Sequence, residues 1–87
     1  MAYKNYMEDA VIDELIGVLE QLKEACACER CREDIVTYAL NRLPAKYVAT
    51  DLGNVYTKLH QVKAQAKTDI VVRLMEAAKV VKENPRH

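Results

Sequence analysis

The sequence contains few of the residues that interrupt helices or supply large aromatic area. Its 87 residues include no Phe, no Trp, two Gly and two Pro. Scarce glycine and proline disfavour a β-rich fold with many tight turns. Five Tyr are the only aromatic residues, so the core has to come mainly from aliphatic side chains. The composition predicts an all-α fold in one domain that spans residues 1–87.

An excess of one charge and long hydrophobic runs are also missing. Thirteen basic residues balance thirteen acidic ones, which argues against generic nucleic-acid binding, because that requires a net basic face. The longest unbroken apolar run is residues 25–28, far short of the roughly 20 residues that cross a membrane. Residues 1–6 contain no apolar signal core. We therefore expect a cytoplasmic protein without membrane insertion.

Apolar residues recur every three or four positions in three stretches, which is the pattern of amphipathic helices. The first helix is predicted over residues 5–24. The second is predicted over residues 30–43 and ends before Pro44, because the residue before a proline avoids helical geometry. Residues 47–49 can lie extended, and a last helix follows over residues 54–83. The sequence thus predicts a small helical domain of three helices, or four if the last one breaks.

The last stretch is long and apolar for so short a chain. A continuous helix of about 29 residues would extend roughly 43 Å, whereas a compact chain of this size has a diameter of roughly 30 Å. The helix therefore either breaks near Thr68 and Asp69 or extends beyond the monomer. Nine of the twelve residues from 70 to 81 are apolar, so we favour a homodimer with Leu74 and Val81 at its interface. A closely packed monomer is the alternative.

Gly17 interrupts the first apolar stripe, where it costs about 1 kcal/mol relative to Ala. It has two interpretations. Either it allows another helix to approach closely, or it is a tolerated surface residue.

Three cysteines lie close together in the sequence Cys26-Ala27-Cys28-Glu29-Arg30-Cys31. An odd, clustered number argues against a disulfide framework. On a continuous helix Cys28 and Cys31 would share a face and Cys26 would point away from it. The three sulfurs can therefore converge only where the helix is interrupted, between the first two helices. Thiolates that converge at a helix start are favoured by its N–H groups, which helps metal binding.

Zinc is the leading metal, because its structural sites take four tetrahedral ligands from Cys and His. Cys26, Cys28 and Cys31 would supply three of them. The fourth is His60, His87 or a group of another chain, and the spacing does not distinguish these. An iron–sulfur cluster, which generally uses four Cys, and unliganded thiols that pack as small apolar groups are the alternatives.

Motifs of catalysis are missing from the sequence. It contains no nucleophile elbow, no phosphate-binding glycine loop and no HExxH helix, so we expect no enzymatic activity. Arg42, Lys46 and Tyr47 lie near one another before the last helix, where a guanidinium and an aromatic ring could hold a base and a phosphate. The simpler interpretation is that the tyrosine packs and the charges are solvated.

Residues 26–48 read CACERCREDIVTYALNRLPAKYV, and this combined motif resembles the ComFB family of late competence development proteins. The matching pieces are the C-x-C-x-x-C cluster, the helix start Glu33-Asp34-Ile35, the helix end Ala39-Leu40-Asn41-x-Leu43-Pro44, the pair Tyr47-Val48 and the N-terminal Asn5-Tyr6-Met7-Glu8. Many relatives have a second Pro where this chain has Ala45. Some place a fourth cysteine beyond the last helix, at about the place of His87.

The resemblance implies a helical homodimer with one zinc ion in each subunit and a non-enzymatic role in competence and DNA uptake. Some members of the wider family bind a cyclic dinucleotide, notably cyclic di-GMP. Carried over to this chain, that implies ligand contacts from Asp34, Asn41, Arg42 and Tyr47. Two functions therefore remain open, a binding module for cyclic di-GMP and a structural adaptor of the DNA-uptake machinery without a small ligand.

Overall fold

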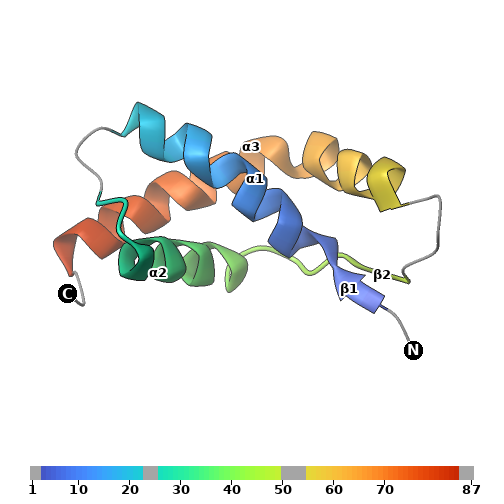
Figure 1. Ribbon diagram of the computed structural model, residues 1–87, viewed down its shortest axis with the longest axis horizontal. Helices are drawn as coiled ribbons and strands as arrows, with labels where there is room; N and C mark the ends of the chain where they lie inside the picture. The colour runs from blue at the N-terminus through green and yellow to red at the C-terminus, as the bar shows by residue number, and fades with distance from the viewer. Residues whose placement is uncertain (1–2, 23–25, 50–54, 85–87) are drawn as a thin grey trace.

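The structure, a computed structural model of the chain, describes residues 3–22, 26–49 and 55–84. Five elements follow one another in these ranges, namely β1 (Tyr3–Asn5), α1 (Tyr6–Gln21), α2 (Glu29–Leu40), β2 (Tyr47–Ala49) and α3 (Val55–Glu83). Both shorter helices pack against the long α3, and the β1–β2 ribbon lies at the end of the molecule where α3 begins (Figure 1). The prediction of a small helical domain is confirmed, with three helices.

Helix α1 begins where the side chain of Asn5 caps it. The Asn5 Oδ1 atom accepts a hydrogen bond from the Met7 backbone N–H at 3.1 Å, as N-cap residues do. The same oxygen accepts the N–H of Lys46 at 2.8 Å, so the cap also holds the segment after α2. Glu8 and Asp9 occupy the first turn, where their negative charges interact favourably with the helix dipole. The helix ends at Gln21, three residues before the predicted end at residue 24, and Leu22 is its C-cap with non-helical angles of φ −100° and ψ 76°.

Helix α2 ends at Leu40, three residues before its predicted end. The chain leaves the helix through tighter turns, in which the N–H of Arg42 reaches the carbonyl of Ala39 at 3.0 Å and that of Leu43 reaches Leu40 at 3.4 Å. Such three-residue bonds commonly close a last helical turn.

The extended segment Tyr47–Ala49 was predicted, but its partner strand was not. The two strands are antiparallel, with Lys4 opposite Val48, and the N–H of Tyr6 bonds to the carbonyl of Lys46 at 2.8 Å. A strand of three residues leaves no readable periodicity in the sequence. The ribbon joins the start of α1 to the segment that leads from α2 to α3.

Helix α3 is continuous over 29 residues, so of the two alternatives the break near Thr68 and Asp69 does not occur. The chain accommodates this helix by being elongated, with extents of 41 × 24 × 19 Å, rather than spherical. Helix α1 crosses α3 near the middle of the molecule, and α2 packs against the C-terminal part of α3 (Figure 1). Among the described residues, no helix combines the length and the apolar character that would be needed to cross a membrane.

The core receives buried side chains from all three helices. They are Met7, Ala10, Val11, Leu15 and Val18 of α1, Cys31, Ile35 and Ala39 of α2, and Ile70, Leu74, Ala77, Ala78 and Val81 of α3. Leu74 and Val81 are therefore covered by α1 and α2 of the same chain. The prediction that they lie at a dimer interface was wrong, because apolar content alone does not show which side of α3 the neighbouring helices cover.

Gly17 lies on the exposed side of α1, and a Cβ atom built there would meet no atom within 4 Å. It is therefore a surface residue rather than a helix contact. We expect Gly17→Ala to raise the free energy of unfolding by about 0.5–1 kcal/mol, because alanine loses less backbone entropy on entering a helix. Urea denaturation monitored by circular dichroism measures this. Ala64→Gly, on the exposed side of α3, should lower it by a similar amount, and a loss of stability in Gly17→Ala would show that the site is covered.

Candidate metal centre

The connection between α1 and α2 places three cysteines together. Cys28 is the N-cap of α2, with extended backbone angles of φ −66° and ψ 161°, and Cys31 lies in the first turn of that helix. Because the backbone is not helical at Cys28, the side chain of Cys26 can turn back toward the other two. The three Sγ atoms all lie within 4.8 Å of one another. This confirms the prediction that they converge where the helix is interrupted.

The three thiols differ in their burial. Cys31 is 1% exposed and belongs to the hydrophobic core, Cys26 is half-buried, and Cys28 is exposed. A surface depression opens at Cys28 and is also lined by Glu29, Arg30 and Glu33. The cluster is therefore anchored in the core on one side and reachable from solvent on the other.

Hydrogen bonding and burial shift the pKa values of two thiols in opposite directions. The pKa of Cys28 is lowered, first by a hydrogen bond from the backbone N–H of Cys31 and then by one from the side chain of Cys26. Burial, together with hydrogen bonds and charge from the neighbouring sulfurs of Cys26 and Cys28, raises the pKa of Cys31 to about 12. Without a cation, the thiolate is thus favoured at Cys28 and disfavoured at Cys31. A metal ion between the sulfurs would stabilise all three as thiolates.

The donor set fits a thiophilic metal such as zinc. None of the three cysteines is in a disulfide, and thiolate sulfur is a ligand that structural zinc sites commonly use. Within the described ranges, no histidine, aspartate or glutamate joins the group. Three ligands are thus close together, and a tetrahedral site needs one more.

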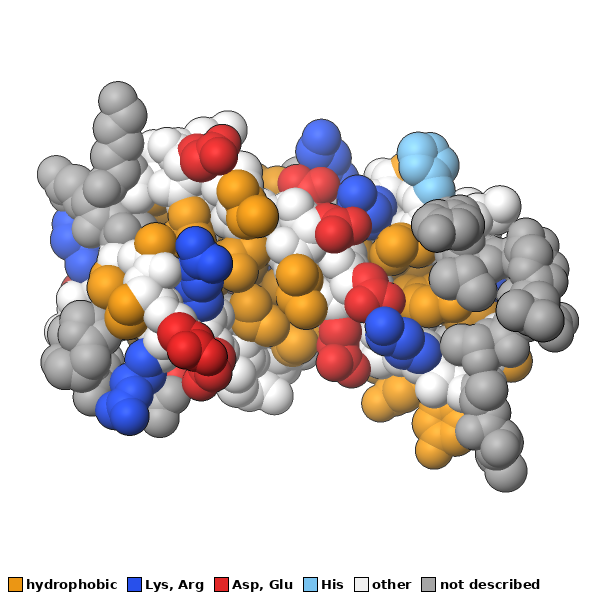
Figure 2. Space-filling view, viewed as in Figure 1, with side chains coloured by type: hydrophobic (Ala, Val, Ile, Leu, Met, Phe, Trp, Pro, Cys, Tyr) orange, Lys and Arg blue, Asp and Glu red, His pale blue; other side chains and the backbone are white. Residues whose placement is uncertain are grey.

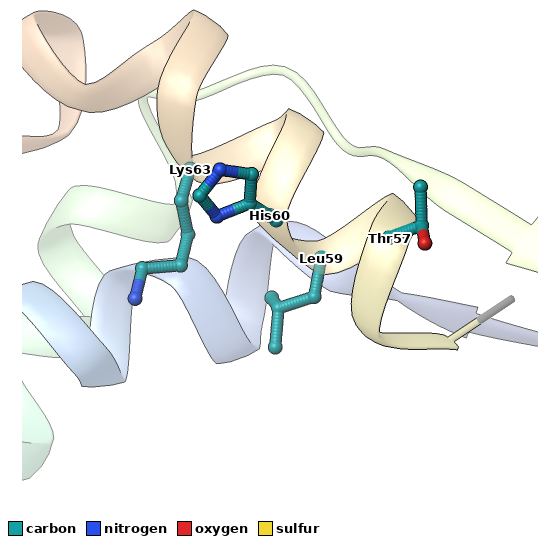
Figure 3. Close-up of a pocket in the computed structure, with 4 residues that line it drawn as sticks. All are labelled: Thr57, Leu59, His60 and Lys63. Carbon is teal, nitrogen blue, oxygen red and sulfur yellow. The ribbon is translucent and has the colours of Figure 1, made fainter.

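Neither histidine supplies the fourth ligand within the described residues. His60 is exposed near the start of α3, where it lines an open pocket with Thr57, Leu59 and Lys63 (Figure 3). That end of α3 is the far end of the molecule from the start of α2 (Figure 1). His87 lies outside the described residues. The opposite end of α3 packs near the cysteines, since Val81 shares a core cluster with Cys31.

The residues implied as cyclic-dinucleotide contacts are spread over α2 and β2. Asp34 is half-buried in α2, Asn41 and Arg42 are exposed just after it, and Tyr47 is exposed on β2. The guanidinium of Arg42 does stack on an aromatic ring, but the ring is that of Tyr38, 3.5 Å from its centroid.

Two tyrosines that sequence reasoning did not single out shape this region. Arg42 donates a hydrogen bond to the carbonyl of Tyr38 at 3.2 Å. The two residues are four positions apart, and this helical spacing could have predicted their contact from the sequence. The ring of Tyr47 meets Tyr3 edge to face, with centroids 6.0 Å apart. That contact depends on the unpredicted pairing of β1 with β2.

Comparisons with known proteins agree with this architecture. The family model described as "Late competence development protein ComFB" matches residues 4–85. The competence protein ComFB of Bacillus subtilis (strain 168) is 35% identical over 79 residues, which cover 90% of this chain and 81% of that protein. A solved structure of the late competence protein ComFB from Bacillus subtilis superposes with a TM-score of 0.77 at 32% identity, covering 95% of this chain and 91% of the other. This chain therefore belongs to the ComFB family of late competence development proteins.

Proposed function

We propose that this protein is a zinc-stabilised, dimeric accessory protein of competence that binds a cyclic dinucleotide and has no catalytic activity. The observation that carries the proposal is the convergence of Cys26, Cys28 and Cys31 within 4.8 Å, at the junction of α1 and α2, in a chain of the ComFB family. Family membership supports the link to competence.

The metal would act as a cross-link between two helices. Cys26 lies on the connection from α1, whereas Cys28 and Cys31 belong to the start of α2. A zinc ion held by all three would fix the angle at which the chain turns from one helix into the next. His87 or a group of another chain would complete the tetrahedron. The ion serves structure here, because structural sites close all four positions with protein ligands.

A second copy of the chain would cover the face formed by α1 and α2. Ile12 and Ile16 are 53% and 59% exposed on α1, and Ile12 lines a groove with Val36 of α2. Hydrophobic side chains gather at the centre of this face (Figure 2). Exposed apolar groups of this kind mark interaction surfaces. Arg32 and Glu33 border the groove. In a two-fold dimer the same surface of each subunit forms the interface, so Arg32 of one subunit can pair with Glu33 of the other.

We expect the double variant Ile12→Asp, Ile16→Asp to dissociate the dimer. Burial of an isoleucine contributes about 1.5–3 kcal/mol, so losing both should raise the dissociation constant about 100-fold or more. Light scattering coupled to size exclusion measures the mass. Val72→Asp, a residue 50% exposed on α3, is the matched control and should leave the mass unchanged. If the double variant remained dimeric, or if Val72→Asp dissociated, the interface would lie elsewhere on the protein.

Calorimetry tests the cyclic-dinucleotide ligand. We expect cyclic di-GMP to release heat on titration into the wild-type dimer. Arg42→Ala should weaken binding about tenfold or more, because charge-assisted hydrogen bonds to phosphate contribute about 1.5–3 kcal/mol. Arg73→Ala on α3, where the guanidinium pairs with Glu76 at 3.1 Å, should bind like wild type.

The absence of heat at high micromolar cyclic di-GMP would favour the second candidate function, a structural adaptor of the DNA-uptake machinery. The exposed apolar groove between α1 and α2 is the observation that favours it. A pull-down that recovers competence proteins regardless of added nucleotide would support the adaptor.

A further inference from the structure

The three thiols of the cluster are not equivalent toward reagents in solution. Cys28 is exposed, Cys31 is 1% exposed, and Cys26 lies between them in burial. Cys28 and Cys31 form a C-x-x-C pair whose first residue is the N-cap of α2 and whose second lies in the first helical turn. Their sulfurs lie within 4.8 Å of each other. The pair thus consists of a solvent-accessible thiol, Cys28, next to a buried one, Cys31.

We propose that Cys28 is a thiol–disulfide exchange site, at which a low-molecular-weight disulfide oxidises the Cys28–Cys31 pair. The proposal goes beyond the structural metal site and rests on it only for the accompanying release of zinc. The same geometry that brings the sulfurs within coordinating distance brings them close enough to react in sequence.

The exchange balances in two steps. The Cys28 thiolate attacks one sulfur of the incoming disulfide, which forms a mixed disulfide on Cys28 and expels the first small thiolate. Cys31, which is a thiolate while the metal ion holds it and otherwise gives up its thiol proton to solvent, then attacks the Cys28 sulfur, which forms the Cys28–Cys31 bond and expels the second small thiolate. Two protein thiolates are oxidised while one small disulfide is reduced to two thiolates. The site loses two of its sulfur ligands, and a metal ion held by a single remaining cysteine is released.

The position of the new bond determines its structural effect. A Cys28–Cys31 bridge closes within the N-cap and first turn of α2, so it does not hold the segment that comes from α1. Cys26, the cysteine on that segment, is left as a free thiol. Oxidation would therefore exchange a cross-link between two helices for a bond local to one of them.

The test uses the full chain purified with its metal and oxidised glutathione as the disulfide. Zinc is counted before treatment, and its release is followed with a chromogenic chelator. Remaining thiols are alkylated, and the protein is cleaved after arginine. Because Arg30 separates Cys31 from the other two cysteines, a bridge to Cys31 appears as a linked pair of peptides. We expect nearly complete zinc release, alkylation of Cys26, a Cys28–Cys31 link, and full reversal by dithiothreitol with added zinc.

Matched variants separate the roles of the cysteines. Cys26→Ser keeps the reacting pair and should still form the link, whereas Cys28→Ser should lose the reaction. If either variant fails to fold, the peptide map of the oxidised wild-type protein still shows which two cysteines are linked. A Cys26–Cys31 link, a persistent glutathione adduct on Cys28, or three unreacted thiols with zinc retained would each overturn the proposal. An untreated protein without zinc would instead contradict the proposed metal site, while the peptide map would still decide the exchange at Cys28.

Discussion

Replacing Cys31 by Ser is expected to abolish cooperative folding of this protein. The residue combines two roles, because its side chain is buried in the core and its sulfur lies within 4.8 Å of the other two. Zinc binding by small domains contributes about 10–16 kcal/mol, which is comparable to the total stability of about 5–15 kcal/mol of a typical protein. Circular dichroism should show no thermal transition in the variant, and metal analysis should give one zinc per chain in the wild type and none in Cys31→Ser.

Two controls separate loss of metal from loss of packing. Ala27→Ser changes an exposed residue between two of the cysteines and should melt like wild type with its zinc bound. A strong chelator added to the wild-type protein should reproduce the effect of Cys31→Ser without any mutation. If the chelator removes zinc and the melting curve does not change, the metal has no structural role.

Truncation of Leu74 is expected to have the second largest effect. The side chain is fully buried in the core that α3 forms with α1 and α2. Leu74→Ala should lower the free energy of unfolding by about 2–5 kcal/mol, because it removes buried apolar area and leaves a cavity. Urea denaturation at several protein concentrations measures the loss.

Val72→Ala is the matched control for Leu74→Ala, because it lies two residues away on the same helix and is 50% exposed. It should change the free energy of unfolding by no more than about 0.5 kcal/mol. If Leu74→Ala instead left the stability unchanged and only lowered the mass in solution, Leu74 would lie between subunits, contrary to the packing described above.

Local patterns predicted the helices and the cluster of three cysteines. The three- and four-residue spacing of apolar side chains located all three helices, since that spacing follows from helix geometry alone. The cysteine cluster was also predictable from local sequence. Three residues within one short segment can reach one another through local backbone geometry, and the extended conformation of Cys28 is what brings the sulfurs together.

Longer-range features were decided by the tertiary structure. A break in α3 was considered because a spherical monomer is too short for the whole helix, whereas the chain is elongated. The interface at Leu74 and Val81 was inferred from the apolar content of α3, whereas α1 and α2 of the same chain cover that side of the helix. Strand β1 forms only because a segment more than forty residues away supplies its partner.

The sequence by itself determined the helical class of this protein, its family and the cluster of three cysteine sulfurs, because each depends on residues that are neighbours along the chain. Only the tertiary structure decided which face of α3 is buried, that His60 lies far from the cysteines, and that Ile12 and Ile16 remain exposed. These outcomes depend on how helices pack against one another, and the energy of packing depends on contacts between residues that are distant in sequence.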